Sequence, residues 1–245
     1  MTDFTLSLAL FDFLPVLFTG LAVYWIAAMA QTSDTEQSYL PFLGAALVFG
    51  AGALKATWKL TVTLTQQDIS WMANALFLLM APGFVLLVVG LWEQRRRLAG
   101  KTMPIWGWSV AWLLIVLTYG LAAYRTWLAP VERGWFMPMM SLASLGNITL
   151  TILLFMTAWG QGKRGLAFLF TVNLAMVFAL IPIAQVAHKS IALHWFEEAL
   201  TTFGAACFAV AAYRLYQLLA LAHTRAHTRD HTQERVRTVG LPVAR

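Results

Sequence analysis

Seven long, almost continuously apolar stretches alternate with short polar segments along the chain. The stretches are residues 8–30, 40–63, 70–93, 105–127, 136–161, 166–188 and 191–221. Each has the roughly 20 apolar residues that an α-helix needs to cross the hydrocarbon core of a bilayer. The pattern predicts an all-α membrane protein in which residues 1–222 form a seven-helix transmembrane domain. Residues 223–245 are then a basic, histidine-containing cytoplasmic tail.

Composition supports a bilayer as the environment of this chain. Of its 245 residues, 60% are hydrophobic and 11% are charged, and the mean hydropathy is +0.68. Soluble domains carry about 25% charged residues, so most of this surface must face something other than water. The net charge of +6 does not indicate a nucleic-acid partner, because the basic residues form short clusters between apolar stretches. The lipid bilayer is the partner that this distribution favours.

The loops predict how the chain is oriented. Basic segments follow the third, fifth and seventh stretches, and such segments are typical of the cytoplasmic side. This puts the N-terminus outside and the C-terminus in the cytoplasm. The acidic segment QTSDTEQSY argues mildly against this orientation and is outweighed by the three basic segments. We therefore expect a multi-pass protein of a bacterial inner membrane.

Short sequence matches suggest a faint internal repeat. Residues 70–84 share five letters with residues 194–208 without a gap, and FLP at 13–15 recurs as FMP at 136–138 with nearly the same offset. Chance is the alternative, but a true duplication would give a 3+1+3 plan with two parallel triplets. That layout resembles those of sugar-transporting SWEET proteins and of microbial rhodopsins. The resemblance is one of layout alone, because the last stretch lacks a retinal-binding lysine and the repeats lack a Pro-Gln pair.

Ionisable residues within the apolar stretches are the strongest functional signal. A charged side chain deep in a bilayer costs about 2.5–3.5 kcal/mol even on insertion scales, so it usually faces a partner or a wet cavity. Lys55 and Lys59 lie one helical turn apart, and Lys59 is near enough to the outer end to reach the interface. Lys55 is deeper, and we expect it to pair with Glu197 or Glu198 of the seventh stretch.

Further polar residues gather in the outer halves of the stretches and predict a periplasm-facing pocket. The residues expected to line it are Asp12, Lys55, Lys59, Asn74, Tyr119, Gln185, His194, Glu197 and Glu198. Such a pocket would bind a small polar or anionic solute, with Lys55 attracting an anionic group and a glutamate carrying a coupling proton. Prolines at 15, 82, 138 and 182 are expected to kink the helices and let them rock.

Three functions fit this pattern, and transport of the solute is our first choice. The alternatives are a receptor or sensor that signals through a protein partner at the tail, and a non-catalytic structural subunit of a larger membrane complex. Enzymatic activity is disfavoured, since the chain has no Gly-x-Ser-x-Gly motif and no Walker loop, and we assign no catalytic residue. His194 and Glu198 share a helical face but lack a third metal ligand, so we assign no metal site. The sequence indicates no particular cofactor.

Overall fold

The structure is a computed structural model that describes residues 5–31, 39–129, 131–184, 186 and 190–238. Its elements are α1 (Leu6–Phe11), α2 (Phe13–Ala30), α3 (Leu40–Thr65), α4 (Ser70–Leu98), α5 (Trp106–Ala123), the π-helix η1 (Tyr124–Leu128), α6 (Phe136–Gly160), α7 (Arg164–Ala184) and α8 (Ile191–Thr238). Among the described residues, seven helical spans are long and apolar enough to cross a membrane. The prediction of an all-helical, multi-pass membrane protein is confirmed. The acidic segment before Tyr39 lies almost entirely outside the described residues.

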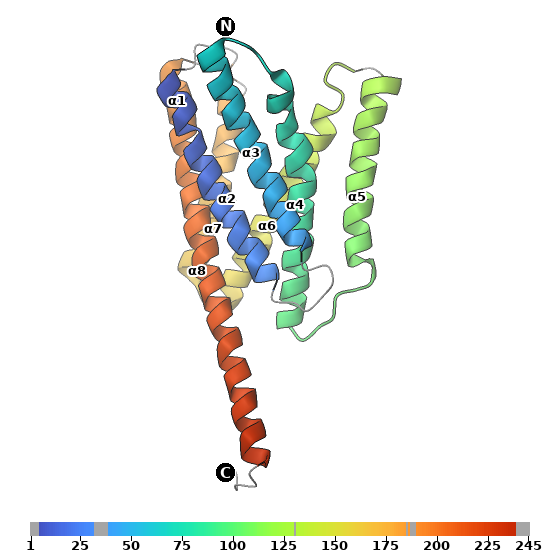
Figure 1. Cartoon of the computed structure of the whole chain (residues 1–245), viewed down its shortest axis with the longest axis vertical. Helices are drawn as coiled ribbons and strands as arrows, with labels where there is room; N and C mark the ends of the chain where they lie inside the picture. Colours follow the sequence, from blue (N-terminus) through green and yellow to red (C-terminus); the bar gives the residue numbers. More distant parts are fainter. Residues whose placement is uncertain (1–4, 32–38, 130, 185, 187–189, 239–245) are drawn as a thin grey trace.

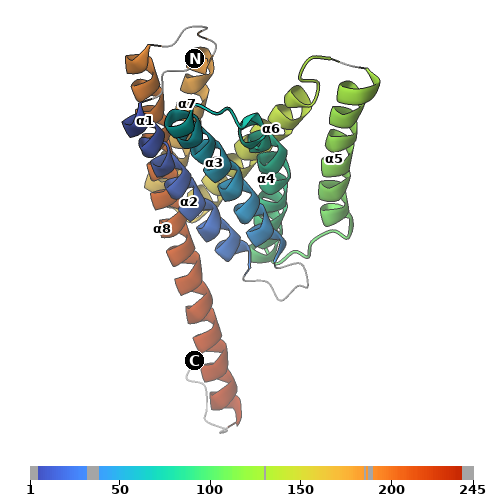
Figure 2. The ribbon, with the colours of Figure 1, turned by 45° about the horizontal axis from the view of Figure 1, so that its top comes forward.

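Successive spans run in alternate directions, and six of them close a ring. α1 begins near the upper end of Figure 1, and α8 leaves the bundle at the lower end. Around the ring, α2, α3, α4, α6, α7 and α8 each pack against the next, and α8 returns to α2. α5 stands outside this ring, where it packs against α4 and α6 (Figure 2). The protein interior is therefore built from six spans, and the fourth span is peripheral.

The first span is interrupted where α1 meets α2. Pro15 has no N–H, and its ring would clash with the carbonyl of Phe11 in a continuous helix. The helix is broken at Asp12, between those two residues. Pro82 and Pro182 lie inside α4 and α7, as the sequence suggests. Pro138 differs, because it occupies the first turn of α6, where a missing N–H removes no intrahelical hydrogen bond.

Glycines allow α3 and α4 to pack with their backbones in close approach. A Cβ added to Gly44 would lie 2.7 Å from the carbonyl oxygen of Gly83, and a Cβ added to Gly83 would lie 2.9 Å from that of Gly44. A Cβ on Gly146 of α6 would lie 2.7 Å from the Cβ of Phe84 on α4. Small residues serve membrane helices in this way, because helix association within lipid depends on close packing.

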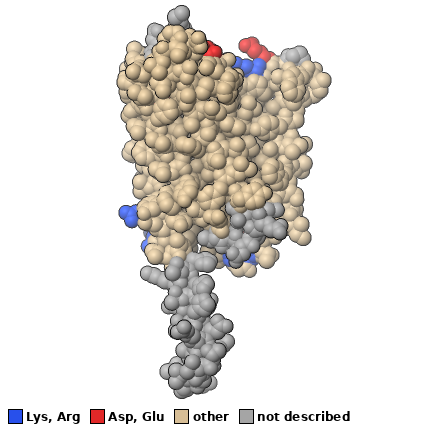
Figure 3. Space-filling model, viewed as in Figure 1, with Lys and Arg blue, Asp and Glu red and all other residues tan. Residues whose placement is uncertain are grey.

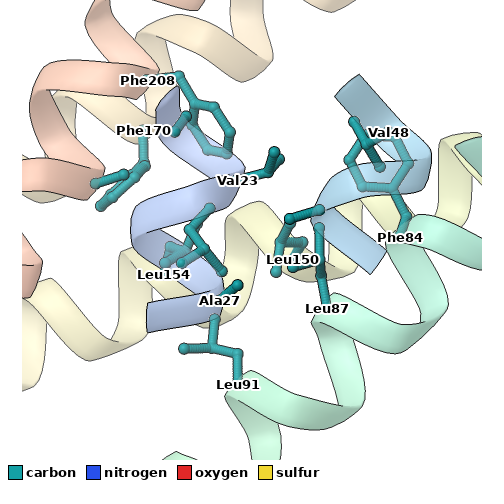
Figure 4. Packing of buried hydrophobic residues seen from close by; sticks show 14 of the residues in the cluster. Val23, Ala27, Val48, Phe84, Leu87, Leu91, Leu150, Leu154, Phe170 and Phe208 are labelled. Carbon is teal, nitrogen blue, oxygen red and sulfur yellow. The ribbon is translucent and has the colours of Figure 1, made fainter. Parts of the chain in front are cut away.

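The apolar core fills the space at which the six ring helices meet. Figure 4 shows Val23 of α2, Phe84 and Leu87 of α4, and Phe170 and Phe208 among its buried side chains. The rings of Phe170 and Phe208 join α7 to α8 edge to face, with centroids 5.8 Å apart. On the outside, the charged side chains visible in Figure 3 lie near the upper and lower rims, with an uncharged band between them. Such a band is the surface expected of a chain embedded in a bilayer.

Candidate functional site

Three charged side chains from distant parts of the chain meet inside the bundle. The Nζ atom of Lys59 lies 2.5 Å from Oε1 of Glu198 and 3.1 Å from Oδ2 of Asp12. All three residues are buried, with exposed fractions of 8% for Lys59, 7% for Glu198 and 8% for Asp12. We call Asp12, Lys59 and Glu198 the charge cluster. Its members come from the α1–α2 junction, from α3 and from α8, so it ties three segments together.

Antiparallel packing brings these residues to one height. Lys59 lies six residues before the end of α3 at Thr65, and Glu198 lies seven residues after the start of α8 at Ile191. At 1.5 Å per residue, both are roughly 10 Å from the upper helix ends. The break at Asp12 places the third charge at a similar depth. The rings of Phe11 and Trp195 pack edge to face above the cluster, with centroids 5.4 Å apart. Phe11 directly precedes Asp12, and Trp195 lies one helical turn before Glu198.

The two lysines exchange the roles that the sequence suggests for them. Lys59, which was expected to extend to the interface, is the buried partner of both carboxylates. Lys55 is half-buried and interacts electrostatically, at longer range, with Lys59 and with the carboxylates of Asp12, Glu198 and Glu197. In the described part of the chain, Lys55 forms no ion pair within 4.0 Å. The expected pairing of Lys55 is therefore replaced by that of Lys59, because Lys59 lies level with the carboxylates.

Of the other predicted site residues, some lie near the charge cluster and some do not. Glu197 and His194 are half-buried on α8, adjacent to Glu198 and one turn above it. Asn74 is exposed on α4, and no hydrogen bond or ion pair between described residues joins it to the charge cluster. Gln185 lies outside the described residues. The structure thus assembles Asp12, Lys55, Lys59, Glu197 and Glu198 at one site, with His194 beside them.

Tyr119 has a different role from the one that the sequence suggests. Its hydroxyl donates a hydrogen bond to the backbone carbonyl of Leu78 on α4. This carbonyl would normally accept from the N–H four residues later, but that residue is Pro82, which has none. Tyr119 therefore satisfies a carbonyl that the proline leaves open, and it fastens the peripheral α5 to the ring.

A cavity of about 190 Å³ lies deeper in the bundle than the charge cluster. Its polar lining consists of Thr19, Asn147, Asn173 and Thr201, from α2, α6, α7 and α8. We call it the midplane cavity, because Asn147 and Asn173 lie near the middle of their spans.

The midplane cavity and the charge cluster share helix faces. Thr201 follows Glu198 by three residues, and Thr19 follows Asp12 by seven. Residues at these spacings lie on one face of a helix. Charged and neutral polar groups are therefore stacked along the same sides of α2 and α8.

Sequence reasoning missed the lower members of this stack and a third buried acid, Glu93. Asn173 gave a signal, as an amide within an apolar stretch, whereas Thr19 and Thr201 gave none because threonine is common in membrane helices. The hydrophobic pattern ends the third stretch at Glu93, whereas α4 continues to Leu98. Its carboxylate is buried and accepts hydrogen bonds from Arg97 and from the indole of Trp108, at 2.8 and 3.1 Å.

Neither metal chemistry nor similarity to known proteins adds to this picture. Within the ranges that the structure describes, no group of three or more His, Cys, Asp and Glu side chains is arranged to hold a metal ion. No known protein family, curated protein or solved structure matches the chain. The fold defines the class, a multi-pass membrane protein with seven candidate transmembrane spans. The function has to be argued from the charge cluster and the midplane cavity.

Proposed function

We propose that this protein binds a small polar solute inside its helix bundle and transports it across the membrane. The observation that carries the proposal is the buried ammonium of Lys59, which is shared by the carboxylates of Asp12 and Glu198. A pair that served only to fix helix register would need one carboxylate. The second one adds a buried charge, and intramembrane charges usually mark solute, ion or proton pathways.

The charge cluster is suited to exchange a proton. Among the described residues, the acids around it are Asp12, Glu197 and Glu198, the bases are Lys55 and Lys59, and His194 lies one turn above. With every acid and lysine ionised and histidine neutral, the formal charge of these described groups is one negative unit. Uptake of one proton by a cluster carboxylate neutralises this formal charge and leaves Lys59 with one ionised carboxylate of the charge cluster instead of two. The link between α3 and either α8 or the α1–α2 junction is then weakened, which lets these segments move apart.

The surroundings of the lysines favour a neutral solute over an anionic one. The ammonium of Lys59 is held by two carboxylates, so an anion would have to displace one of them. Lys55 lies within electrostatic range of the ammonium of Lys59 and of three carboxylates, those of Asp12, Glu198 and Glu197, and the carboxylates outnumber the lysines there. We therefore propose a neutral polar solute and not an anionic one.

We also propose an orientation in the membrane and an internal symmetry. Arg95, Arg96 and Arg97 end α4 at the lower end, and Lys163 and Arg164 begin α7 there. By the positive-inside rule, this end faces the cytoplasm of a bacterial inner membrane and the charge cluster faces the periplasm. The peripheral position of α5 supports a 3+1+3 plan, in which α2–α4 and α6–α8 are the triplets and α5 is the linker.

Uptake by proteoliposomes tests the proposal. Light scattering would follow the entry of urea, acetamide and glycerol into liposomes that contain the purified protein, with and without an inward proton gradient. We expect entry faster than into protein-free liposomes, and a further acceleration by the gradient that Glu198→Gln abolishes. The matched control is Glu132→Gln, which neutralises an exposed loop glutamate at the same end and should behave as wild type. Equal rates with and without protein for all three solutes would refute transport.

The position of α5 favours a second function, that of a subunit in a larger membrane complex. Most of its side chains are exposed, including Leu113, Val116, Leu117 and Leu121 at 51–63% for these four. Native mass spectrometry of the protein extracted from its own membranes would reveal a stable partner.

A receptor role is favoured only by α8, which continues past the end of its span at Leu221 to Thr238, roughly 25 Å further.

A further inference from the structure

We propose that the midplane cavity is the solute site and that it binds a small uncharged molecule of the amide, urea or small-alcohol class. This inference rests on the proposed transport function and specifies its substrate class. It depends on three properties of the cavity, which are its open hydrogen-bonding groups, its lack of charge and its size.

Asn173 presents the most informative of these groups. Its exposed fraction is 8%, and its carboxamide makes no hydrogen bond to any residue that the structure describes. The oxygen lies against Gly204, where an added Cβ would be 3.4 Å from Oδ1. Buried polar groups in proteins are nearly always hydrogen-bonded, and leaving one open is unfavourable. The cavity therefore has to supply the partner of this amide, either water or a small solute that displaces it.

Two other lining residues extend the same chemistry. The carboxamide of Asn147 also makes no hydrogen bond within the described ranges, and it faces the cavity from α6. The hydroxyl of Thr201 donates to the carbonyl of Glu197 at 2.8 Å, which leaves its oxygen able to accept. Two amide groups offer both donors and acceptors, so the complementary ligand has both as well. Primary amides, urea and small alcohols meet this requirement.

The remaining lining sets limits on charge and size. None of the residues that line the midplane cavity is ionisable, and a charge left there without a counter-charge would be strongly disfavoured. Met80, Phe84, Met176 and Phe208 supply apolar contacts. A volume of about 190 Å³ corresponds to about six waters at liquid density and is below the pockets of about 300 Å³ or more that hold drug-sized ligands. The cavity therefore suits molecules of a few heavy atoms.

A second, separate cavity borders this site on one side. It measures about 280 Å³, lies between α4, α6 and α7, and shares Met80, Phe84, Asn147 and Val177 with the midplane cavity. Asn147 therefore stands at the boundary between the two. Ser144 adds one more hydroxyl to the lining of this second cavity.

Methionine methyl groups inside the site report its occupancy without relying on transport. Protein with ¹³C-methyl methionine in nanodiscs is titrated with acetamide or with sodium acetate, which have the same shape but differ in charge. We expect acetamide to shift the signals of Met80 and Met176 and to leave Met103, at the lower end of the bundle, unchanged. Acetate should shift none of them. Asn173→Leu should weaken acetamide binding about tenfold or more, because it removes both hydrogen-bonding groups of one amide.

Two further variants keep the result decisive. Asn74→Leu makes the same change on the exposed face of α4 and should bind acetamide as the wild type does. Ala205→Leu fills the cavity from α8 without removing a polar group, and it replaces Asn173→Leu if that variant does not fold. Loss of the methionine shifts in Ala205→Leu supports the site.

Several results would overturn the inference. They are the absence of acetamide shifts at Met80 and Met176, equal shifts with acetate, and full binding by Asn173→Leu or Ala205→Leu. Shifts without uptake by proteoliposomes would support the binding site and refute transport. Uptake without shifts would support transport and refute the midplane cavity as the solute site.

Discussion

The ammonium of Lys59 on α3 lies 2.5 Å from the carboxylate of Glu198 on α8, although 139 residues separate them in the chain. Asp12 adds a second carboxylate at 3.1 Å. The contact joins α3 to α8 near the upper end of the bundle, where the first span packs against both of them. Removing the ammonium would leave two acids facing each other in a buried site.

Lys59→Met should therefore destabilise the protein strongly. Loss of one partner from a buried ion pair costs about 3–5 kcal/mol, because the remaining charge is left uncompensated. Lys55→Met is the matched control, since it makes the same change one turn away on the same helix. We expect a much smaller loss there. Thermal unfolding in detergent, followed by tryptophan fluorescence, compares the two, and an equal or larger effect of Lys55→Met would contradict the assignment.

A double-mutant cycle measures the contact itself. Lys59→Met and Glu198→Gln should each destabilise the protein, whereas the double variant should be less destabilised than the sum of the two. Residues in direct contact show interaction free energies of about 0.5–3 kcal/mol, and we expect the upper part of this range. Strict additivity would show that the two side chains do not interact in the bilayer.

The hydrogen bond from Tyr119 to the carbonyl of Leu78 should contribute to stability only while Pro82 is present. Tyr119→Phe should lower the free energy of unfolding by about 1 kcal/mol, the usual net value of one hydrogen bond. In a Pro82→Ala background the same change should cost little, because the substituted residue supplies the missing N–H within α4. Tyr124→Phe, on the exposed η1, serves as the control. An equal loss from Tyr119→Phe in both backgrounds would exclude this explanation.

The glycine contact between α3 and α4 predicts effects of opposite sign. Gly44→Ala should destabilise the protein by about 1–3 kcal/mol, because its methyl group meets the Gly83 carbonyl. Gly50→Ala, two turns further along α3, places its methyl in open space and should be neutral or stabilise the helix by up to about 1 kcal/mol. Unfolding midpoints of the two variants test this directly, and a shared sign would show that α3 and α4 are packed differently.

The spans were predictable because each is a long, almost continuously apolar stretch of the sequence. α3, α4, α6 and α8 begin at the predicted residues 40, 70, 136 and 191. The peripheral position of α5 could not be predicted in this way, because its stretch is as apolar as those of the ring helices. Only packing shows which helices enclose the core.

The site was predictable in its residue types and its depth, but not in its pairing. Lys55 and Lys59 share a helical face, so sequence spacing could not choose between them. The choice depends on the break at Asp12 and on the height at which α8 starts. The midplane cavity is lined by residues of five helices, and in the sequence only the two amides, Asn147 and Asn173, indicate it.

The central claim is that the charge cluster couples movement of a small neutral solute to movement of a proton. If a proton gradient drives solute entry, a solute gradient must drive protons, because thermodynamic linkage is reciprocal. The most direct measurement records the internal pH of pyranine-loaded proteoliposomes after external acetamide is added with no initial pH difference. Passive leakage of acetamide through lipid carries no proton. We expect acidification with the wild type and none with Glu198→Gln, whereas an unchanged internal pH with the wild type, or equal acidification with both proteins, would contradict coupling of the solute to a proton.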